Sequence, residues 1–204
     1  EFKSRRPHFM YPRLTAMKKK SLAVVIVSNG PGELATWVRP VVDALIKINE
    51  SLDKKDKLDF SLSLVLVPCP NATGNEFNVA NSWNKFELIT KSKSFWRLLI
   101  KPYSFAHWPK KGAVIFLGGD QFWSILLAKR LGYLNITYAE WISRWPQWTD
   151  KIAAMNLKVK KLIPSKHKNK CEIIGDLMAD IKLNTEISLK DTEKFHIALL
   201  PGSK

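Results

Sequence analysis

The stretch that decides the fold is Leu22-Ala-Val-Val-Ile-Val-Ser28, which is followed directly by Asn29-Gly-Pro-Gly-Glu33. The first seven residues are apolar and largely β-branched, which predicts a strand buried on both faces. The two glycines that follow predict a tight loop that lets a ligand approach the backbone closely. An amphipathic pattern over about 34–49 then predicts a helix with Thr36 as its N-cap. This order is typical of a parallel α/β domain.

The same alternation continues along the chain. Further strands are expected at 60–67, 86–89, 113–117, 135–138, 151–156, 171–174 and 195–200. Further helices are expected at about 75–84, 121–131 and 176–183. The pattern predicts an α/β fold, a Rossmann-like parallel sheet with helices on both faces. Ligands of such sheets bind at the carboxyl ends of the strands, which singles out the loops at 28–33, 68–74, 118–121 and 138–150.

The sequence divides into a central domain and two flanking parts. Residues 1–20 carry seven basic and one acidic side chain, and we expect this basic extension to be disordered or non-native. The domain is expected to span 21–183, followed by a polar linker at 184–194. Residues 195–204 combine a buried-type strand with Pro201-Gly-Ser-Lys204. They are interpreted as the first strand and loop of a second domain, at whose start the chain is truncated.

Composition and charge narrow the classes of function. The chain has 204 residues and a net charge of +15, with 46% hydrophobic and 25% charged residues, which is typical of a globular domain. Such an excess of positive charge favours polyanionic partners: nucleic acid, anionic lipid or phosphorylated substrates. No apolar run is long enough to span a bilayer. The two cysteines, Cys69 and Cys171, have no metal-ligand spacing, so we expect free thiols, a cytoplasmic protein and no metal site.

Two glycine-containing loops carry candidate binding and catalytic residues. In the first loop these are Asn29, Gly30, Gly32 and Glu33, which precede a helix whose free N–H groups suit phosphate or carboxylate; the alternative is a tight turn with a solvated glutamate. In the second loop, Asp120 follows a buried strand, where a general base could meet a substrate hydroxyl; the alternative is an N-cap. Gln121 follows it and is a further candidate for substrate binding.

Two aromatic segments are the remaining candidates. Residues 138–148 contain the candidate substrate-binding residues Tyr138, Glu140, Arg144 and Trp145. Aromatic rings there could stack on a sugar or on acyl chains, and an arginine could pair with a phosphate; the alternative is a loop packed by its own aromatic side chains.

Residues 95–108 mix aromatic and cationic side chains. The composition suits contact with a membrane interface through Trp96, Arg97, Lys101, Tyr103 and Trp108. A nucleic-acid face, or core aromatics with snorkelling cations, are the alternatives. Residues 151–170 hold seven lysines and no acid, which indicates either a solvated face or contact with a polyanion.

Several motifs occur together in a fixed order. They are Gly32-Glu33, Phe116-Leu-Gly-Gly-Asp120, the aromatic run 138–148, Ile174-Gly-Asp-Leu-Met-Ala-Asp180 and Leu199-Leu-Pro-Gly-Ser-Lys204. This ordered set resembles the lipid-A-disaccharide synthase family over roughly residues 21–204. The chain departs from the family pattern: the first loop lacks Ser-Gly-Asp, the aromatic loop lacks Ser-Pro, Asp176-Leu177 replaces His-Pro, and Lys204 replaces an arginine. The resemblance is therefore to a divergent type, similar to the synthase-related proteins of cyanobacteria.

The resemblance implies the N-terminal, acceptor-side domain of a GT-B glycosyltransferase. Such an enzyme moves an acylated glucosamine from a UDP-sugar donor to a phosphorylated glycolipid acceptor, by an inverting, metal-independent transfer without a cofactor. By position, Asp120 becomes the candidate general base, and Ser203 belongs to the motif that opens the donor domain. The resemblance further implies a cytoplasmic protein on the inner face of the plasma membrane, with 95–108 against the anionic lipid surface. The fragment alone is expected to be inactive.

Two other functions stay open. One is a different GT-B enzyme, similar to the peptidoglycan glycosyltransferase or to a UDP-sugar epimerase. The other is a basic nucleic-acid-binding domain, which is disfavoured because no recognisable nucleic-acid-binding motif is present and much of the charge lies in residues 1–20.

Overall fold

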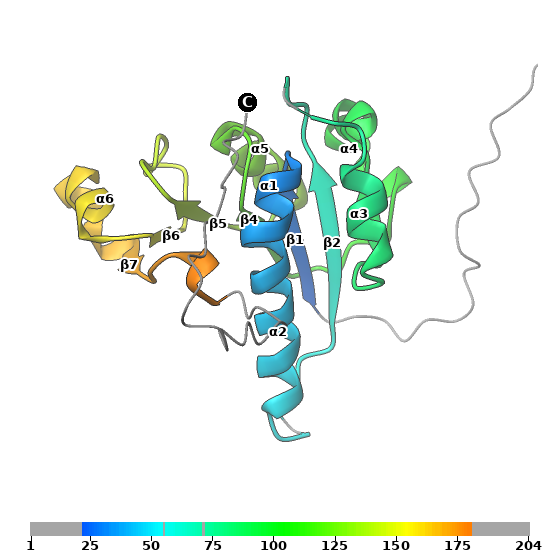
Figure 1. Cartoon of the computed structure of the whole chain (residues 1–204), viewed down its shortest axis with the longest axis horizontal. Helices are drawn as coiled ribbons and strands as arrows, with labels where there is room; N and C mark the ends of the chain where they lie inside the picture. The colour runs from blue at the N-terminus through cyan, green and yellow to red at the C-terminus, as the bar shows by residue number, and fades with distance from the viewer. Residues whose placement is uncertain (1–21, 55, 71, 181–204) are drawn as a thin grey trace, which may run out of the picture.

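The computed structural model describes residues 22–180 except 55 and 71. The predictions for 1–20, 184–194 and 195–204, Ser203 among them, lie outside the described residues. Seven strands form one sheet in which every pair is parallel, in the order β3-β2-β1-β4-β5-β6-β7 (Figure 1). The strands are β1 (Leu22–Ser28), β2 (Phe60–Leu66), β3 (Leu88–Thr90), β4 (Gly112–Phe116), β5 (Leu134–Ala139), β6 (Lys151–Ala154) and β7 (Cys171–Ile173). The predicted α/β class and Rossmann-like sheet are confirmed.

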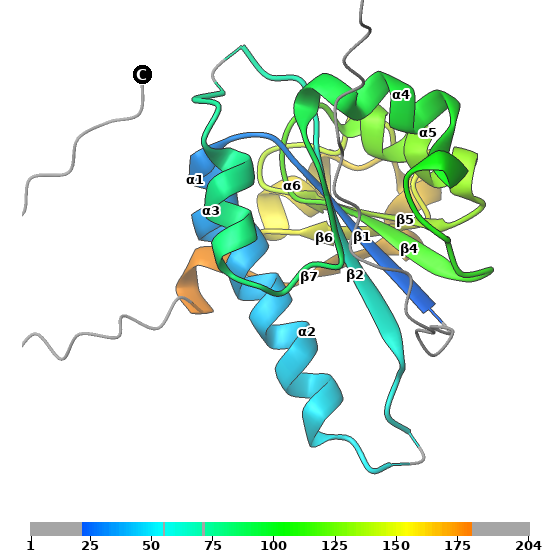
Figure 2. The same ribbon diagram turned by 90° about the vertical axis from the view of Figure 1, so that its right-hand side faces the viewer.

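Helices cover both faces of the sheet, as Figure 2 shows with α2 and α3 on one side and α4 and α5 on the other. The α-helices are α1 (Pro31–Glu33), α2 (Arg39–Ser51), α3 (Glu76–Ser82), α4 (Phe95–Ile100), α5 (Gln121–Leu131) and α6 (Leu157–Leu162). The π-helical segment is η1 (Leu34–Val38), and the 3-10 turns are η2 (Ser92–Ser94), η3 (Pro102–Ser104), η4 (Ser165–Lys170) and η5 (Leu177–Asp180).

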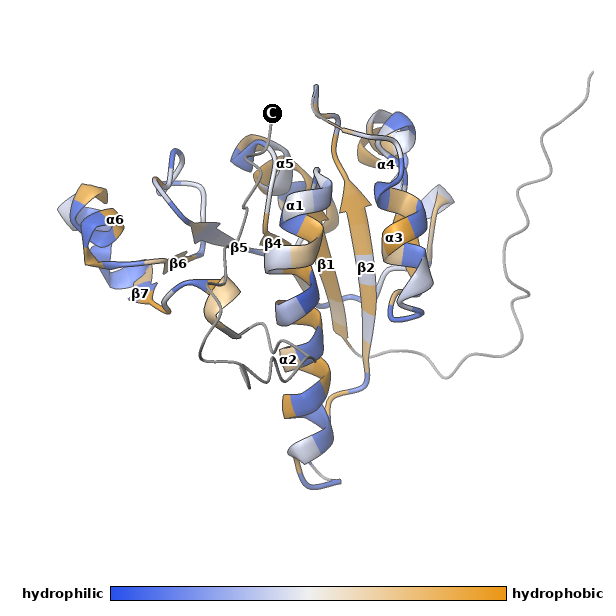
Figure 3. Cartoon of the chain, in the orientation of Figure 1, coloured by the Kyte–Doolittle hydropathy of each residue, from blue (hydrophilic) through white to orange (hydrophobic). Residues whose placement is uncertain are grey.

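The central strand β1 builds the core by sending alternate side chains to opposite faces. Val25 and Val27 pack with Phe95 of α4 and Leu127 of α5. On the other face, the neighbouring residues of β1 pack with Leu34, Val38 and Val42 of the first helical stretch and with Ala80 of α3. In Figure 3 the strand β1 is almost continuously apolar, β2 alternates between apolar and paler bands, and α2 alternates between apolar and hydrophilic residues. The burial of β1 on both faces follows directly from its unbroken apolar sequence.

The first helix begins earlier than the sequence predicts. Its N-cap is Gly30, and Pro31 occupies the first helical position, where its missing N–H costs nothing. Thr36, predicted as the N-cap, lies inside the helix and donates its hydroxyl to the Gly32 carbonyl at 2.9 Å. The π-helical turn η1 ends just before Pro40, which has no N–H to continue an α-helical ladder.

Three smaller predictions also need correction. The third strand is Leu88–Thr90 instead of 86–89. The lysine-rich stretch for which no helix is predicted contains α6 and η4, which cross from β6 to β7. The predicted helix at 176–183 appears as the 3-10 turn η5, and residues beyond 180 lie outside the described part.

Candidate functional site

The candidate site is a cleft of about 470 Å³ at the carboxyl ends of β1, β2, β4 and β5. It brings together most of the residues that the sequence singles out: Asn29, Glu33, Asp120, Gln121, Tyr138, Glu140 and Arg144. The chain runs outward from β1 to β2 and β3, and then returns to the other side of β1 at β4. Ligands of doubly wound sheets bind where the strand order reverses in this way.

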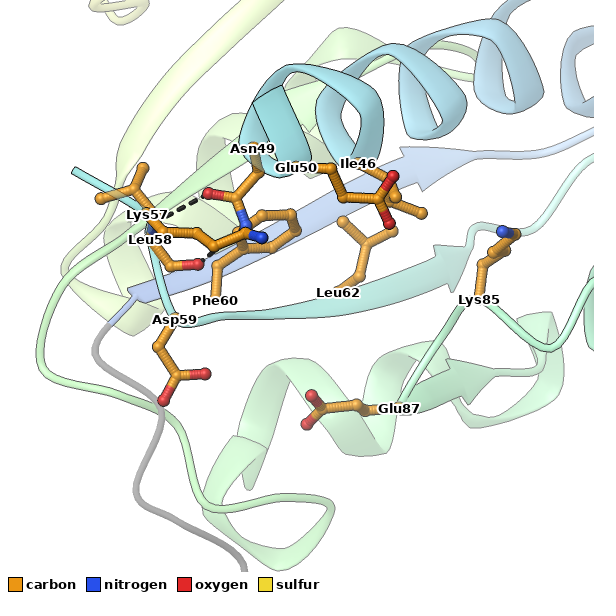
Figure 4. Close-up of a pocket in the computed structure, with 10 residues that line it drawn as sticks. All are labelled: Ile46, Asn49, Glu50, Lys57, Leu58, Asp59, Phe60, Leu62, Lys85 and Glu87. Carbon is orange, nitrogen blue, oxygen red and sulfur yellow. Dashed lines mark hydrogen bonds between the residues drawn. The ribbon is translucent and has the colours of Figure 1, made fainter. Parts of the chain in front are cut away.

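A second hollow, of about 380 Å³, lies at the amino ends of β2 and β3, opposite the ends that form the cleft (Figure 4). On one side of this hollow, Asn49 near the end of α2 makes two hydrogen bonds with the backbone of Leu58: Nδ2 donates to the Leu58 carbonyl at 2.9 Å, and Oδ1 accepts from the Leu58 N–H at 2.8 Å. Leu62 is buried at its base, whereas Glu50, Lys57 and most of the other charged lining groups are exposed. Asn49 thus anchors the turn that leads into β2, and the carboxyl-end cleft is the better candidate for a ligand site.

Glycines bring the first and second loops into close contact. A Cβ atom at Gly118 would lie 3.0 Å from each of three atoms: Asn29 Oδ1, Glu33 Cγ and Ser28 Oγ. A Cβ atom at Gly30 would collide with the carboxylate of Glu33. The glycines therefore make room for Glu33 between the loops.

The roles predicted for Gly30 and Gly32 need revision, since neither lines the cleft. Gly30 is buried as the N-cap of α1, and Gly32 is exposed in α1 with nothing within 4 Å of its Cβ position.

Asp120 is both an N-cap and a residue of the cleft. Its Oδ1 accepts the Phe122 N–H at 2.9 Å, which confirms the predicted capping of α5. The residue is exposed, lines the cleft and follows Gly119, whose φ of 91° turns the chain out of β4. The cap occupies one carboxylate oxygen, so this geometry accommodates a capping role and a catalytic role in the same side chain.

Polar groups without partners lie where β1 ends. Ser28 Oγ and Asn29 Oδ1 are buried and have no hydrogen-bond partner among the described residues. Groups of this kind are normally satisfied by water or by a ligand. Tyr138 closes the cleft beside them, with its ring 5.6 Å from Trp37 in an edge-on arrangement, and burial raises the pKa of its hydroxyl.

Gln121 holds the loop after β5 instead of facing a ligand. The side chain is 9% exposed. Its Nε2 donates to the Ile142 carbonyl at 2.7 Å, and its Oε1 accepts the Arg144 N–H at 2.8 Å. Both ends of the amide are thus engaged by the loop, which argues against the predicted direct contact with substrate.

The aromatic loop combines packed and exposed rings. Trp145 does not line the cleft; its ring stacks on Trp148 at 5.1 Å and lies 6.1 Å from Phe122, as the packing alternative predicts. The tryptophan of this loop that does line the cleft is Trp141, which is 77% exposed. With Trp37 of η1 it forms part of an apolar rim. Neither residue is among the predicted site residues, because the sequence alone does not show which rings of the helix and of the aromatic loop face the cleft.

The segment 95–108 is split between surface and core. Trp96 is 50% and Tyr103 69% exposed, and Arg97 and Lys101 are also exposed. Trp108 is 7% exposed and donates Nε1 to the Pro102 carbonyl at 2.9 Å. The predicted membrane contact of Trp108 is therefore wrong, because its ring is part of the core.

A chain of edge-on and tilted rings links α4 to the aromatic loop. The rings of Trp96 and Trp123 are 4.9 Å apart, those of Trp123 and Phe122 are 5.4 Å apart, and Phe122 in turn reaches Trp145.

In the described part of the chain, no helix is long and apolar enough to cross a bilayer.

The cysteines and the lysine-rich stretch 151–170 are the remaining parts of the described chain that the sequence singles out. Cys69 lines the cleft and Cys171 is buried, and neither forms a disulfide. Within the described ranges, no three His, Cys, Asp or Glu side chains are grouped to hold a metal ion. Lys158, Lys161 and Lys166 are exposed, whereas Lys170 donates Nζ to the Thr149 carbonyl at 3.0 Å.

No model of a known protein family matches the chain, and no curated protein matches it either.

Proposed function

We propose that this chain is the acceptor-side domain of a GT-B-type glycosyltransferase similar to the lipid-A-disaccharide synthases. The observation that carries the proposal is the composition of the carboxyl-end cleft. Glu33 and Asp120 place carboxylates beside the glycine turns, whereas Trp37 and Trp141 supply an apolar rim. This combination suits a ligand with a reacting hydroxyl and an apolar portion. The family resemblance of the ordered motifs supports the same choice.

In the proposed reaction, a carboxylate removes the proton from the acceptor hydroxyl. The acceptor oxygen then forms a bond to the anomeric carbon of the donor sugar, while the bond between that carbon and the UDP oxygen breaks. The anomeric configuration inverts, UDP leaves, and the proton stays on the carboxylate. Asp120 is the first candidate for this base because it is exposed at the end of β4. Glu33 is the second candidate.

The surface of α4 supports a peripheral membrane location for this proposed enzyme. The exposed aromatic rings of Trp96 and Tyr103 accompany the exposed Ile100 and the cations of Arg97 and Lys101. Rings of this kind settle at the headgroup level of a bilayer, and the cations attract anionic lipid. An enzyme with a lipid acceptor would use this face on the cytoplasmic side of the plasma membrane.

The test uses the full-length protein that contains this chain. UDP release is followed with UDP-diacylglucosamine as donor and a diacylglucosamine phosphate as acceptor in detergent. Asp120→Asn is the informative variant, because asparagine also caps helices and so preserves the start of α5. UDP release that falls by two to four orders of magnitude in this variant supports the reaction and the base, as expected for a lost general base. No UDP release by the unmodified protein would refute the proposed reaction.

A further inference from the structure

We propose that Gln121 is a positioning residue, which fixes Arg144 at the cleft so that an anionic group of the ligand binds at that end. The anchoring of the loop by Gln121 is supported directly by its hydrogen bonds. The identity of the ligand rests on the proposed function.

The side chain of Gln121 acts as a bridge to a separate segment of the chain. Gln121 opens α5, and its amide donates to the Ile142 carbonyl at 2.7 Å while accepting the Arg144 N–H at 2.8 Å. A neutral amide is needed for this arrangement, because a donor and an acceptor must be presented together. Glutamate lacks the donor, methionine lacks both groups, and asparagine is one methylene shorter.

The far end of the same loop is anchored independently. The Thr149 hydroxyl donates to the Trp145 carbonyl at 3.1 Å, and the ring of Trp145 packs between Phe122 and Trp148. Arg144 therefore lies between two fixed points, its own N–H on Gln121 and the packed ring that follows it. Because the backbone of Arg144 is held in this way, less backbone entropy is lost when its exposed guanidinium binds a ligand.

The charges of the cleft give Arg144 a distinct role. Three carboxylates line the cleft in the described structure, those of Glu33, Asp120 and Glu140, and Arg144 is the single lysine or arginine among the lining residues. An anion would be repelled by the carboxylates and attracted by the guanidinium, which can bind phosphate or carboxylate through paired hydrogen bonds. A ligand that carries one anionic group is thus held in one orientation, with its anion at Arg144 and its uncharged part toward the carboxylates.

The anchoring is tested by hydrogen exchange of the Arg144 amide in the full-length protein, measured by mass spectrometry on peptides spanning 139–148. Gln121→Met keeps the size of the side chain and removes both hydrogen bonds. We expect exchange to accelerate roughly tenfold, as the loss of one to two hydrogen bonds allows. The matched control is Ser124→Ala on the same helix, which removes two buried hydrogen bonds, from Ser124 Oγ to the Gln121 carbonyl and from Asn135 Nδ2 to Ser124 Oγ, neither of which involves residues 139–148. Unchanged exchange in Gln121→Met, or equal acceleration in Ser124→Ala, overturns the anchoring.

The anion-binding role is tested by equilibrium binding, independently of sugar transfer. A short-chain diacylglucosamine phosphate and its unphosphorylated analogue are titrated while tryptophan fluorescence is followed. We expect the unmodified protein to bind the phosphorylated compound about tenfold more tightly or better, and both Arg144→Ala and Gln121→Met to remove that preference. Equal affinity for the two compounds in the unmodified protein overturns the role of Arg144, as does a preference that survives in Arg144→Ala. Failure to release UDP would instead refute the glycosyltransferase and leave a measured phosphate preference standing.

Discussion

Gly118, which lines the cleft in the loop after β4, and Gly32, which lies in α1, should respond oppositely to substitution by alanine. In Gly118→Ala the new methyl group would lie 3.0 Å from Asn29 Oδ1, Glu33 Cγ and Ser28 Oγ. These side chains come from the end of β1 and the start of the first helix, and they must shift by a few tenths of an ångström to make room for the methyl group. Overpacking of this kind destabilises by roughly 1–3 kcal/mol. Displacement of Glu33 should also lower UDP release by about ten- to a hundredfold.

Gly32→Ala is the control, because nothing lies within 4 Å of its Cβ position and the residue is already helical. We expect it to gain about 0.5–1 kcal/mol, since alanine loses less backbone entropy in a helix than glycine does. Urea unfolding followed by tryptophan fluorescence measures both changes, and UDP release from the full-length protein measures activity. A Gly118→Ala variant as stable and active as the unmodified protein would refute the packing argument. A Gly32→Ala variant that folds normally but loses activity would restore a ligand contact at Gly32.

Three further predictions use other parts of the structure. Asp120→Ala should lose about 1 kcal/mol of stability relative to Asp120→Asn, because only alanine removes the cap on the Phe122 N–H; equal unfolding midpoints would contradict this. Trp108→Ala should lower the free energy of unfolding by about 3–5 kcal/mol because the ring is buried. Trp96→Ala should change this free energy little but reduce the fraction of protein that sediments with anionic vesicles. The reverse pattern would contradict the assignment of Trp108 to the core and Trp96 to the surface. Burial raises the pKa of Tyr133 from 10.0 to about 12, so the unfolded chain loses this proton first as the pH rises, and stability should fall by roughly 1.4 kcal/mol per pH unit between these values. Tyr133→Phe should flatten that part of the pH profile, although it also loses the hydrogen bond to the Pro109 carbonyl.

The parts of the fold that are correctly predicted are those whose sequence signal is local. The unbroken apolar run of β1 identifies a strand buried on both faces. Asp120 marks the start of α5 because the capping residue and the N–H that it caps are two positions apart. In contrast, α6 escapes prediction because it has six residues, of which Val159 alone is buried, so its sequence carries no amphipathic period. The start of the first helix is misplaced because Pro31 between two glycines is typical of a turn as well as of a first helical position.

The sequence predicts the location of the cleft more accurately than it predicts which residues contact one another there. Parallel strands bring their carboxyl ends to one edge, so residues that follow β1, β4 and β5 meet there whatever their detailed packing. Which aromatic ring reaches the solvent is a different question, decided by tertiary contacts. Trp108 and Trp96 lie in the same basic, aromatic segment, and the sequence predicts membrane contact for both of them. The core of α4 and η3 buries one and leaves the other half exposed.

Asp120 and Gln121 show where prediction from sequence ends. They are adjacent, polar and placed at the end of the same strand, so the sequence assigns both of them to the ligand. Their partners separate them: Asp120 caps a backbone N–H of its own helix, whereas Gln121 binds backbone groups 21 and 23 positions further along the chain. A contact over that distance depends on the path of the loop after β5, which no local pattern encodes. The two residues therefore have different roles: the exposed carboxylate of Asp120 faces the cleft, and the buried amide of Gln121 shapes the cleft by holding Arg144.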